Sequence, residues 1–115
     1  MNMAELTDQE TRILNYVAGS LGRSIEDIED FVVPNIKASE IAVKGRIGSD
    51  ETFYVDNFLY ELAVAQLAVS NYMNRSASTD VNLYNTENGF QDYILDLKAD
   101  YWVKHPNGGD TDGTA

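Results

Sequence analysis

The longest apolar segment of the chain is Phe53–Tyr72, FYVDNFLYELAVAQLAVSNY. Its side chains fall on three faces of a helix: Leu59, Leu62, Gln66, Val69 and Met73 on one, Phe58, Ala65 and Tyr72 on another, and Tyr60, Ala63, Val64 and Leu67 on the third. A helix that is apolar nearly all round is a buried helix. We therefore expect one helix, starting at Ser49–Glu51 and ending near Asn74, as a central post for the others.

The length and net charge of the chain limit the number of domains and the kinds of partner that are expected. The chain has 115 residues, no cysteine and one histidine, enough for one domain with its own core and no disulfide. It carries 19 Asp and Glu against 8 Lys and Arg, a net charge of −11. Binding to nucleic acid or to anionic membranes needs clustered Lys and Arg, so neither is expected. An acidic surface suits solubility, a basic partner, or a wall that DNA passes without sticking.

The start of the chain has neither the basic nor the apolar region of a signal peptide. Asp56, Glu61 and Gln66 interrupt the apolar segment, which therefore falls short of a membrane span. We expect a protein that is made and folded in a cytoplasm.

A first helix is predicted from Asp8 to Ala18. Thr7 and Glu10 have the spacing of a capping box. One mostly apolar face follows with helical spacing: Glu10, Ile13, Leu14, Val17 and Leu21. Gly19 and Gly22 are expected to weaken and end this helix.

A second helix is predicted after Ser24, with acidic residues crowding its first turns: Glu26, Asp27, Glu29 and Asp30. A helical stripe then runs through Ile25, Ile28, Val32, Ile36 and Val43. Pro34 either kinks one helix or opens a new one. Because the apolar phase runs through the proline unchanged, the pattern favours a single kinked unit that stops between Gly45 and Gly48.

A long polar stretch, Ser76–Gly89, separates the central segment from the last helix. Loops of this length are functional or are floppy surface segments, and both readings stay open. Val81, Leu83 and Tyr84 could form a brief extended segment that adds a strand to a neighbour. The last helix is marked by Phe90, Tyr93, Ile94, Leu97, Tyr101 and Trp102, with Asn88 as its expected cap.

These patterns predict an all-α fold, a small bundle of about four helices around a central apolar helix, with a long polar loop before the last helix. Residues 1–105 form a single helical domain. Residues 106–115 are acidic and Gly-rich, and we expect them to be disordered.

No catalytic motif is present, so an enzyme is not expected, and no cofactor or metal site is predicted. The glycines form no phosphate loop. Asp110–Gly113 resembles the start of a calcium loop, but the further ligands and the glutamate of the twelfth position are missing. The carboxylates of the second helix are interpreted as a solvated helix start. His105, beside Pro106, is interpreted as a surface residue.

The order of features resembles a known family, the small head-tail connector proteins of long-tailed bacteriophages, also called adaptor or head-completion proteins. The corresponding stretches are Val33–Gly45, Ile47–Tyr54 and Leu62–Ser76, and Tyr72-Met73-Asn74-Arg75 is the most distinctive. Pro34 inside the second helix and the ending Tyr101-Trp102 depart from the family pattern.

The resemblance implies a structural virion protein at the head-tail interface, assembled in the host cytoplasm. Copies would form a ring, typically twelve-fold, below the portal protein, extend the DNA channel and dock the next head-completion or tail protein. DNA would pass through the lumen without specific binding, and we infer that a negative lumen would repel its phosphates. The candidate partner-binding residues are Arg75, Thr79, Val81, Leu83, Tyr84, Tyr101 and Trp102. The alternative hypothesis is an acidic phage-encoded regulator that mimics DNA and occupies a basic protein.

Overall fold

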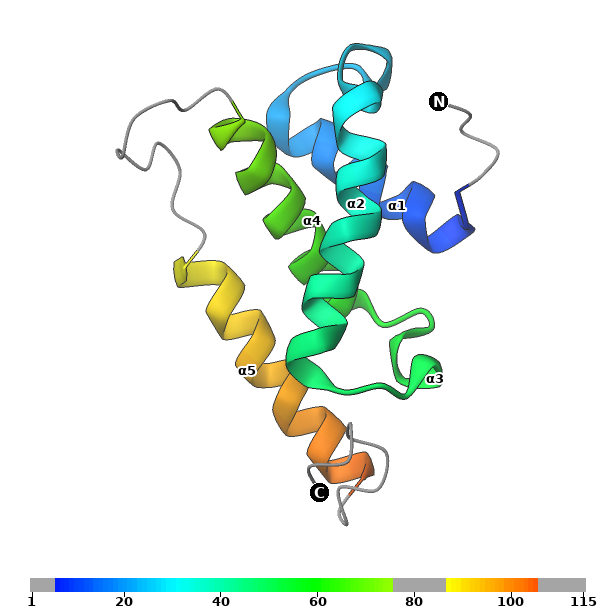
Figure 1. Ribbon diagram of the computed structural model, residues 1–115, viewed down its shortest axis with the longest axis vertical. Coiled ribbons are helices and arrows are strands. Elements are labelled where there is room, and N and C mark those ends of the chain that lie inside the picture. The colour runs from blue at the N-terminus through cyan, green and yellow to red at the C-terminus, as the bar shows by residue number, and fades with distance from the viewer. Residues whose placement is uncertain (1–5, 76–86, 106–115) are drawn as a thin grey trace.

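The computed structural model describes residues 6–75 and 87–105, which form five helices and no strand (Figure 1). In chain order the helices are α1 (Asp8–Leu21), α2 (Ile25–Ile47), α3 (Glu51–Tyr54), α4 (Phe58–Asn74) and α5 (Glu87–Lys104). The predicted all-α bundle is confirmed, with the single turn of α3 added to four longer helices. The predicted disorder of 106–115 concerns residues outside the described part of the chain.

The centre of the fold is the pair α2 and α4. These two helices pack against each other, and each also packs against α1 and α5. In Figure 1, α1 crosses behind the upper part of α2, and α5 runs past its lower end. In α4 the residues Tyr60, Ala63, Val64, Ala65 and Ala68 have no exposed surface. The predicted central helix is therefore enclosed by its own chain over most of its length.

The predicted start of the central helix is wrong. Instead of one helix from Ser49–Glu51 onward, α3 ends at Tyr54 and α4 begins at Phe58. Asp56 between them has a φ of 51°, in the left-handed region that Asp tolerates better than most residues. The Asn57 side chain then caps α4 by accepting a hydrogen bond of 3.1 Å from the Tyr60 N–H. This break leaves Phe58 67% exposed, although the apolar pattern placed it on a buried face.

The first two helices follow their sequence signals closely. The Glu10 N–H donates to Thr7 Oγ1 at 3.0 Å, and the Thr7 N–H donates to Glu10 Oε1 at 2.9 Å, so the predicted capping box is confirmed. α1 continues past Gly19 to Leu21 and ends at Gly22, whose φ of 66° is left-handed. α2 is continuous through Pro34, as the unbroken apolar phase predicted. α5 starts at Glu87, so Asn88 lies inside its first turn and is not the cap.

A close backbone contact joins the end of α2 to the end of α5. The ring of Tyr101 lies directly on Gly48, where a Cβ atom would come within 2.2 Å of Tyr101 Cζ. That ring cannot easily withdraw, because it is fully buried with its edge against Phe53, at 5.0 Å between centroids, and is stacked on His105 at 4.1 Å. Residue 48 must therefore lack a side chain.

We predict that Gly48→Ala destabilises the fold by about 1–3 kcal/mol, because the added methyl group overpacks the contact with Tyr101. The matched control is Gly45→Ala. Gly45 lies inside α2 with nothing within 4 Å of the Cβ position, so the change should stabilise by about 0.5–1 kcal/mol. Urea unfolding of both variants measures the difference. If both variants changed the free energy of unfolding by the same amount in the same direction, the contact between Gly48 and Tyr101 would not be tight.

Two carboxyl groups meet inside the contact between α1 and α2. Burial, then the hydrogen bond with Glu10 and its charge, raise the pKa of Glu40 to about 8. Burial also raises the pKa of Glu10, but hydrogen bonds from Glu40, the Thr7 N–H and Lys37 outweigh it and hold the pKa well below its usual range. The Lys37 ammonium lies 3.3 Å from Glu10 Oε1. At neutral pH the two carboxyl groups therefore share one proton.

We predict that Glu40→Gln flattens the pH dependence of stability. The pKa of Glu40 rises from 4.5 to about 8 on folding, so in this window the folded state keeps a proton that the unfolded chain releases. Wild-type stability therefore falls as pH rises from about 4.5 to 8. The neutral glutamine lacks this effect, and between those two pH values the variant should gain about 1–2 kcal/mol on the wild type, since water screens a half-buried carboxyl.

Urea unfolding at pH 4.5, 6 and 8 measures this gain, with the exposed Glu26→Gln as the control for losing one negative charge. Parallel stability curves for Glu40→Gln and the wild type would contradict the shared-proton pair.

Candidate interaction surface between α2 and α5

The outer side of α5 carries apolar residues that the core does not use. Phe90, Ile94, Leu97 and Tyr101 form its buried face, with spacings of three and four residues. Leu95 is 61% exposed and Trp102 is 49% exposed, one heptad apart on the open side. α5 thus has a second apolar stripe beside its buried one.

Trp102, at one end of this stripe, lines a groove between the C-terminal halves of α2 and α5, which we call the α2–α5 groove. It has a volume of about 490 Å³. Ile41, 73% exposed on α2, and Trp102 on α5 supply its large apolar side chains. Exposed large apolar residues of this kind, framed by charged ones, mark protein interaction sites.

Cations frame the α2–α5 groove, although the chain as a whole is strongly acidic. Lys44, Arg46 and Lys98 all line it. Lys44 is already paired, with its Nζ 2.7 Å from Glu51 Oε1. Arg46 lies 5.4 Å from the centre of the Phe90 ring, and within residues 6–75 and 87–105 neither Arg46 nor Lys98 has a carboxylate partner. Two exposed cations therefore remain available to a carboxylate from outside.

One end of the groove is fixed by a polar clasp, which we define as Asp50, Tyr101 and His105. The Asp50 N–H donates to the Tyr101 hydroxyl at 3.0 Å, and His105 Nε2 lies 2.9 Å from Asp50 Oδ2. His105 Nδ1 faces the Tyr101 carbonyl at 3.0 Å, so an imidazolium satisfies both contacts. Hydrogen bonds from Thr52, and after them the one from His105, hold the pKa of Asp50 below its usual range.

The clasp corrects two predictions. His105 is not a free surface residue, because it joins the end of α5 to the cap of α3. Tyr101 has no exposed surface in this fold and serves the core, so it does not offer a contact to a partner. Of the two aromatic residues at the end of α5, only Trp102 is open to one.

Of the other predicted partner residues, the structure describes only Arg75. The Arg75 guanidinium stacks on the Tyr72 ring at 3.7 Å and donates to the Tyr72 carbonyl at 2.6 Å. It thereby supports the C-terminal end of α4. Thr79, Val81, Leu83 and Tyr84 lie outside the described residues.

A second groove, of about 310 Å³, lies between α1 and α4, with the exposed rings of Tyr16 and Phe58 beside it. Its cation is already neutralised. Arg12 donates to both carboxylate oxygens of Glu61, at 3.2 and 2.9 Å, and to Asp56 at 3.0 Å. Because two carboxylates already hold the cation that lines this groove, the α2–α5 groove is the stronger candidate for a partner.

Sequence reasoning found Trp102 but missed Ile41, Leu95, Arg46 and Lys98. A signal was present for the two apolar residues, because Ile41 and Leu95 are large apolar side chains out of phase with the buried stripes of their helices. No sequence signal brings Arg46 and Lys98 together, since they sit on helices whose packing only the structure gives.

Within the described residues, no three His, Asp or Glu side chains gather as a metal site would require. None of the helices in that part of the chain combines the length and apolarity needed to cross a membrane. The chain matches no protein-family model, no curated protein and no solved structure.

Trp102 is the one tryptophan of the chain, so its fluorescence reports on the groove directly. We predict that acrylamide quenches it readily in the free protein, because the side chain is about half exposed. Trp102→Ala should change the free energy of unfolding by less than about 1 kcal/mol, whereas Tyr101→Phe, which loses the acceptor for the Asp50 N–H, should cost about 1–2 kcal/mol. A shielded tryptophan, or a large loss from Trp102→Ala, would place this residue in the core.

Proposed function

We propose that this chain is a structural subunit of a bacteriophage virion, a head-tail connector that forms a ring below the portal protein. In this role it extends the DNA channel and docks the next head-completion or tail protein. The proposal carries no catalytic step and no cofactor. The order of sequence features, from Val33–Gly45 to the Tyr72–Arg75 motif, supports it.

The observation that carries the proposal is the α2–α5 groove. A subunit of a ring needs a core that closes on itself and a separate surface for its neighbours. In this chain α4 is enclosed without help from a partner, while Ile41 and Trp102 stay exposed beside unpaired cations. A surface of this kind fits an assembly protein better than a catalyst.

The acidic flank of α5 supports the same role. Asp92, Asp96 and Asp100 are exposed and follow one another every four residues, about 6 Å apart along the helix axis. A row of carboxylates on a channel wall repels phosphate and lets DNA slide. We propose that this flank faces the lumen of the ring.

The same row also favours the second candidate, an acidic regulator that mimics DNA, because its spacing is close to that of phosphates along a strand. The row has only three carboxylates, however, and the other acidic group, Glu26–Asp30, lies at the far end of α2. A mimic needs one long continuous acidic face. Competition by this protein for a basic DNA-binding protein would favour the mimic over the connector.

Binding to a portal tests the proposal. The chain is mixed with a cognate oligomeric portal protein and viewed by negative-stain electron microscopy. We predict an added ring below the portal, which Trp102→Glu weakens and which Phe58→Glu, the control at the α1–α4 groove, leaves intact. Portal particles that stay bare at saturating wild-type protein would contradict the connector role.

A further inference from the structure

We propose that the α2–α5 groove of one copy binds the acidic first turns of α2 from a second copy, so that copies join head to tail. We call these turns, Glu26–Asp30, the acidic start of α2. This inference rests on the proposed function, since it names the surfaces through which ring subunits would meet. It also has a test of its own that needs no portal.

The groove selects for a negatively charged segment with an apolar residue beside it. Arg46 and Lys98 are exposed and have no carboxylate partner within the described residues. Ile41 and Trp102 present apolar surface next to them. Charged groups flanking an apolar contact give an interface its register and its preference for one partner.

The acidic start of α2 has the complementary composition. Glu26, Asp27 and Asp30 are exposed, and no ion pair joins them to any cation of residues 6–75 and 87–105. Phe31 follows at once and is 37% exposed, with its ring 5.9 Å from that of Tyr72. The same chain therefore carries an exposed carboxylate cluster with an aromatic ring beside it.

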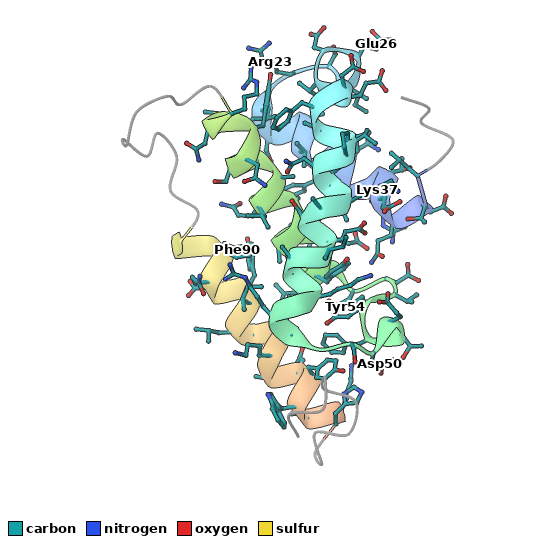
Figure 2. All side chains as sticks on the ribbon, viewed as in Figure 1. Arg23, Glu26, Lys37, Asp50, Tyr54 and Phe90 are labelled. Carbon is teal, nitrogen blue, oxygen red and sulfur yellow. The ribbon has the colours of Figure 1, made fainter. Side chains whose placement is uncertain are left out.

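The two surfaces cannot meet within one molecule. They lie at opposite ends of α2, whose 23 residues span about 33 Å. Figure 2 shows Glu26 at the end of the molecule away from Asp50, which lies beside the groove. A contact between two different patches of identical copies leaves one patch free on each end copy, and it propagates into a ring or a filament.

The helix dipole alone does not account for this arrangement. It explains why acidic residues begin α2 and why Lys44 and Arg46 end it. It does not explain Lys98, six residues before the end of α5, nor the exposed side chains of Ile41 and Trp102 on the same groove. Their convergence requires a further reason, and a docked segment supplies one.

A charge swap tests the contact. The groove variant is Arg46→Glu with Lys98→Glu, and the start variant is Asp27→Lys with Asp30→Lys. Self-association of the full chain is measured by analytical ultracentrifugation at millimolar concentration in low and high salt. We expect the wild type to associate at low salt, each variant alone to associate at least about tenfold more weakly, and a mixture of the two variants to recover association, because each reversed patch then meets a complementary one.

The control is Asp92→Lys with Asp96→Lys on the acidic flank of α5. It changes the net charge by as much as the start variant does, and it should associate as the wild type does. Circular dichroism verifies that all variants keep their helices. The inference is overturned if the wild type stays monomeric, if the control fails as the start variant does, or if the mixture does not recover. A portal that still gains a ring in that case would leave the connector role standing without this contact.

Discussion

The structure depends on the packing of α4 against α2. The buried residues of α4 include three alanines, Ala63, Ala65 and Ala68, which have no exposed surface. Val32, Val33, Ile36 and Val43 are equally buried on α2. Small and branched side chains of this kind let neighbouring helices pack at native density. α1 and α5 each pack against both helices of this pair and complete the core.

The way α5 is attached to α2 determines which apolar residues stay exposed on the surface of the protein. α5 is held against the end of α2 by the Tyr101 ring on Gly48 and by the clasp from Asp50 to His105. With its inner face fixed in this way, the other apolar residues of α5 point outward. The α2–α5 groove, with Trp102 and Ile41, is therefore a direct result of how α5 is anchored. Its exposed cations then set the kind of partner that it accepts.

Sequence periodicity predicted the helices well because most of them have one buried stripe and clear caps, such as Thr7 with Glu10 and the glycine at position 22. It did not predict the break at Asp56-Asn57. There Asp56 takes a left-handed conformation and Asn57 caps a new helix within an apolar segment. It placed Tyr101 in the apolar spacing of α5, but it could not reveal the contacts that Tyr101 and His105 make with residues about fifty positions away in sequence. The groove could be predicted only in part. An apolar residue that does not fit the spacing of the buried stripe of its helix is expected to be exposed, but the sequence does not show which residues lie beside it.

Hydrogen exchange measured on the free chain and on its self-associated form tests whether α4 is enclosed and whether the chain meets its neighbours through the α2–α5 groove. We expect the amides of α4 to exchange slowest in both states. On association, protection should rise at both ends of α2 and at the end of α5, and it should not change in α1. Fast exchange throughout α4, or a rise in protection confined to the α1–α4 groove, would contradict these expectations.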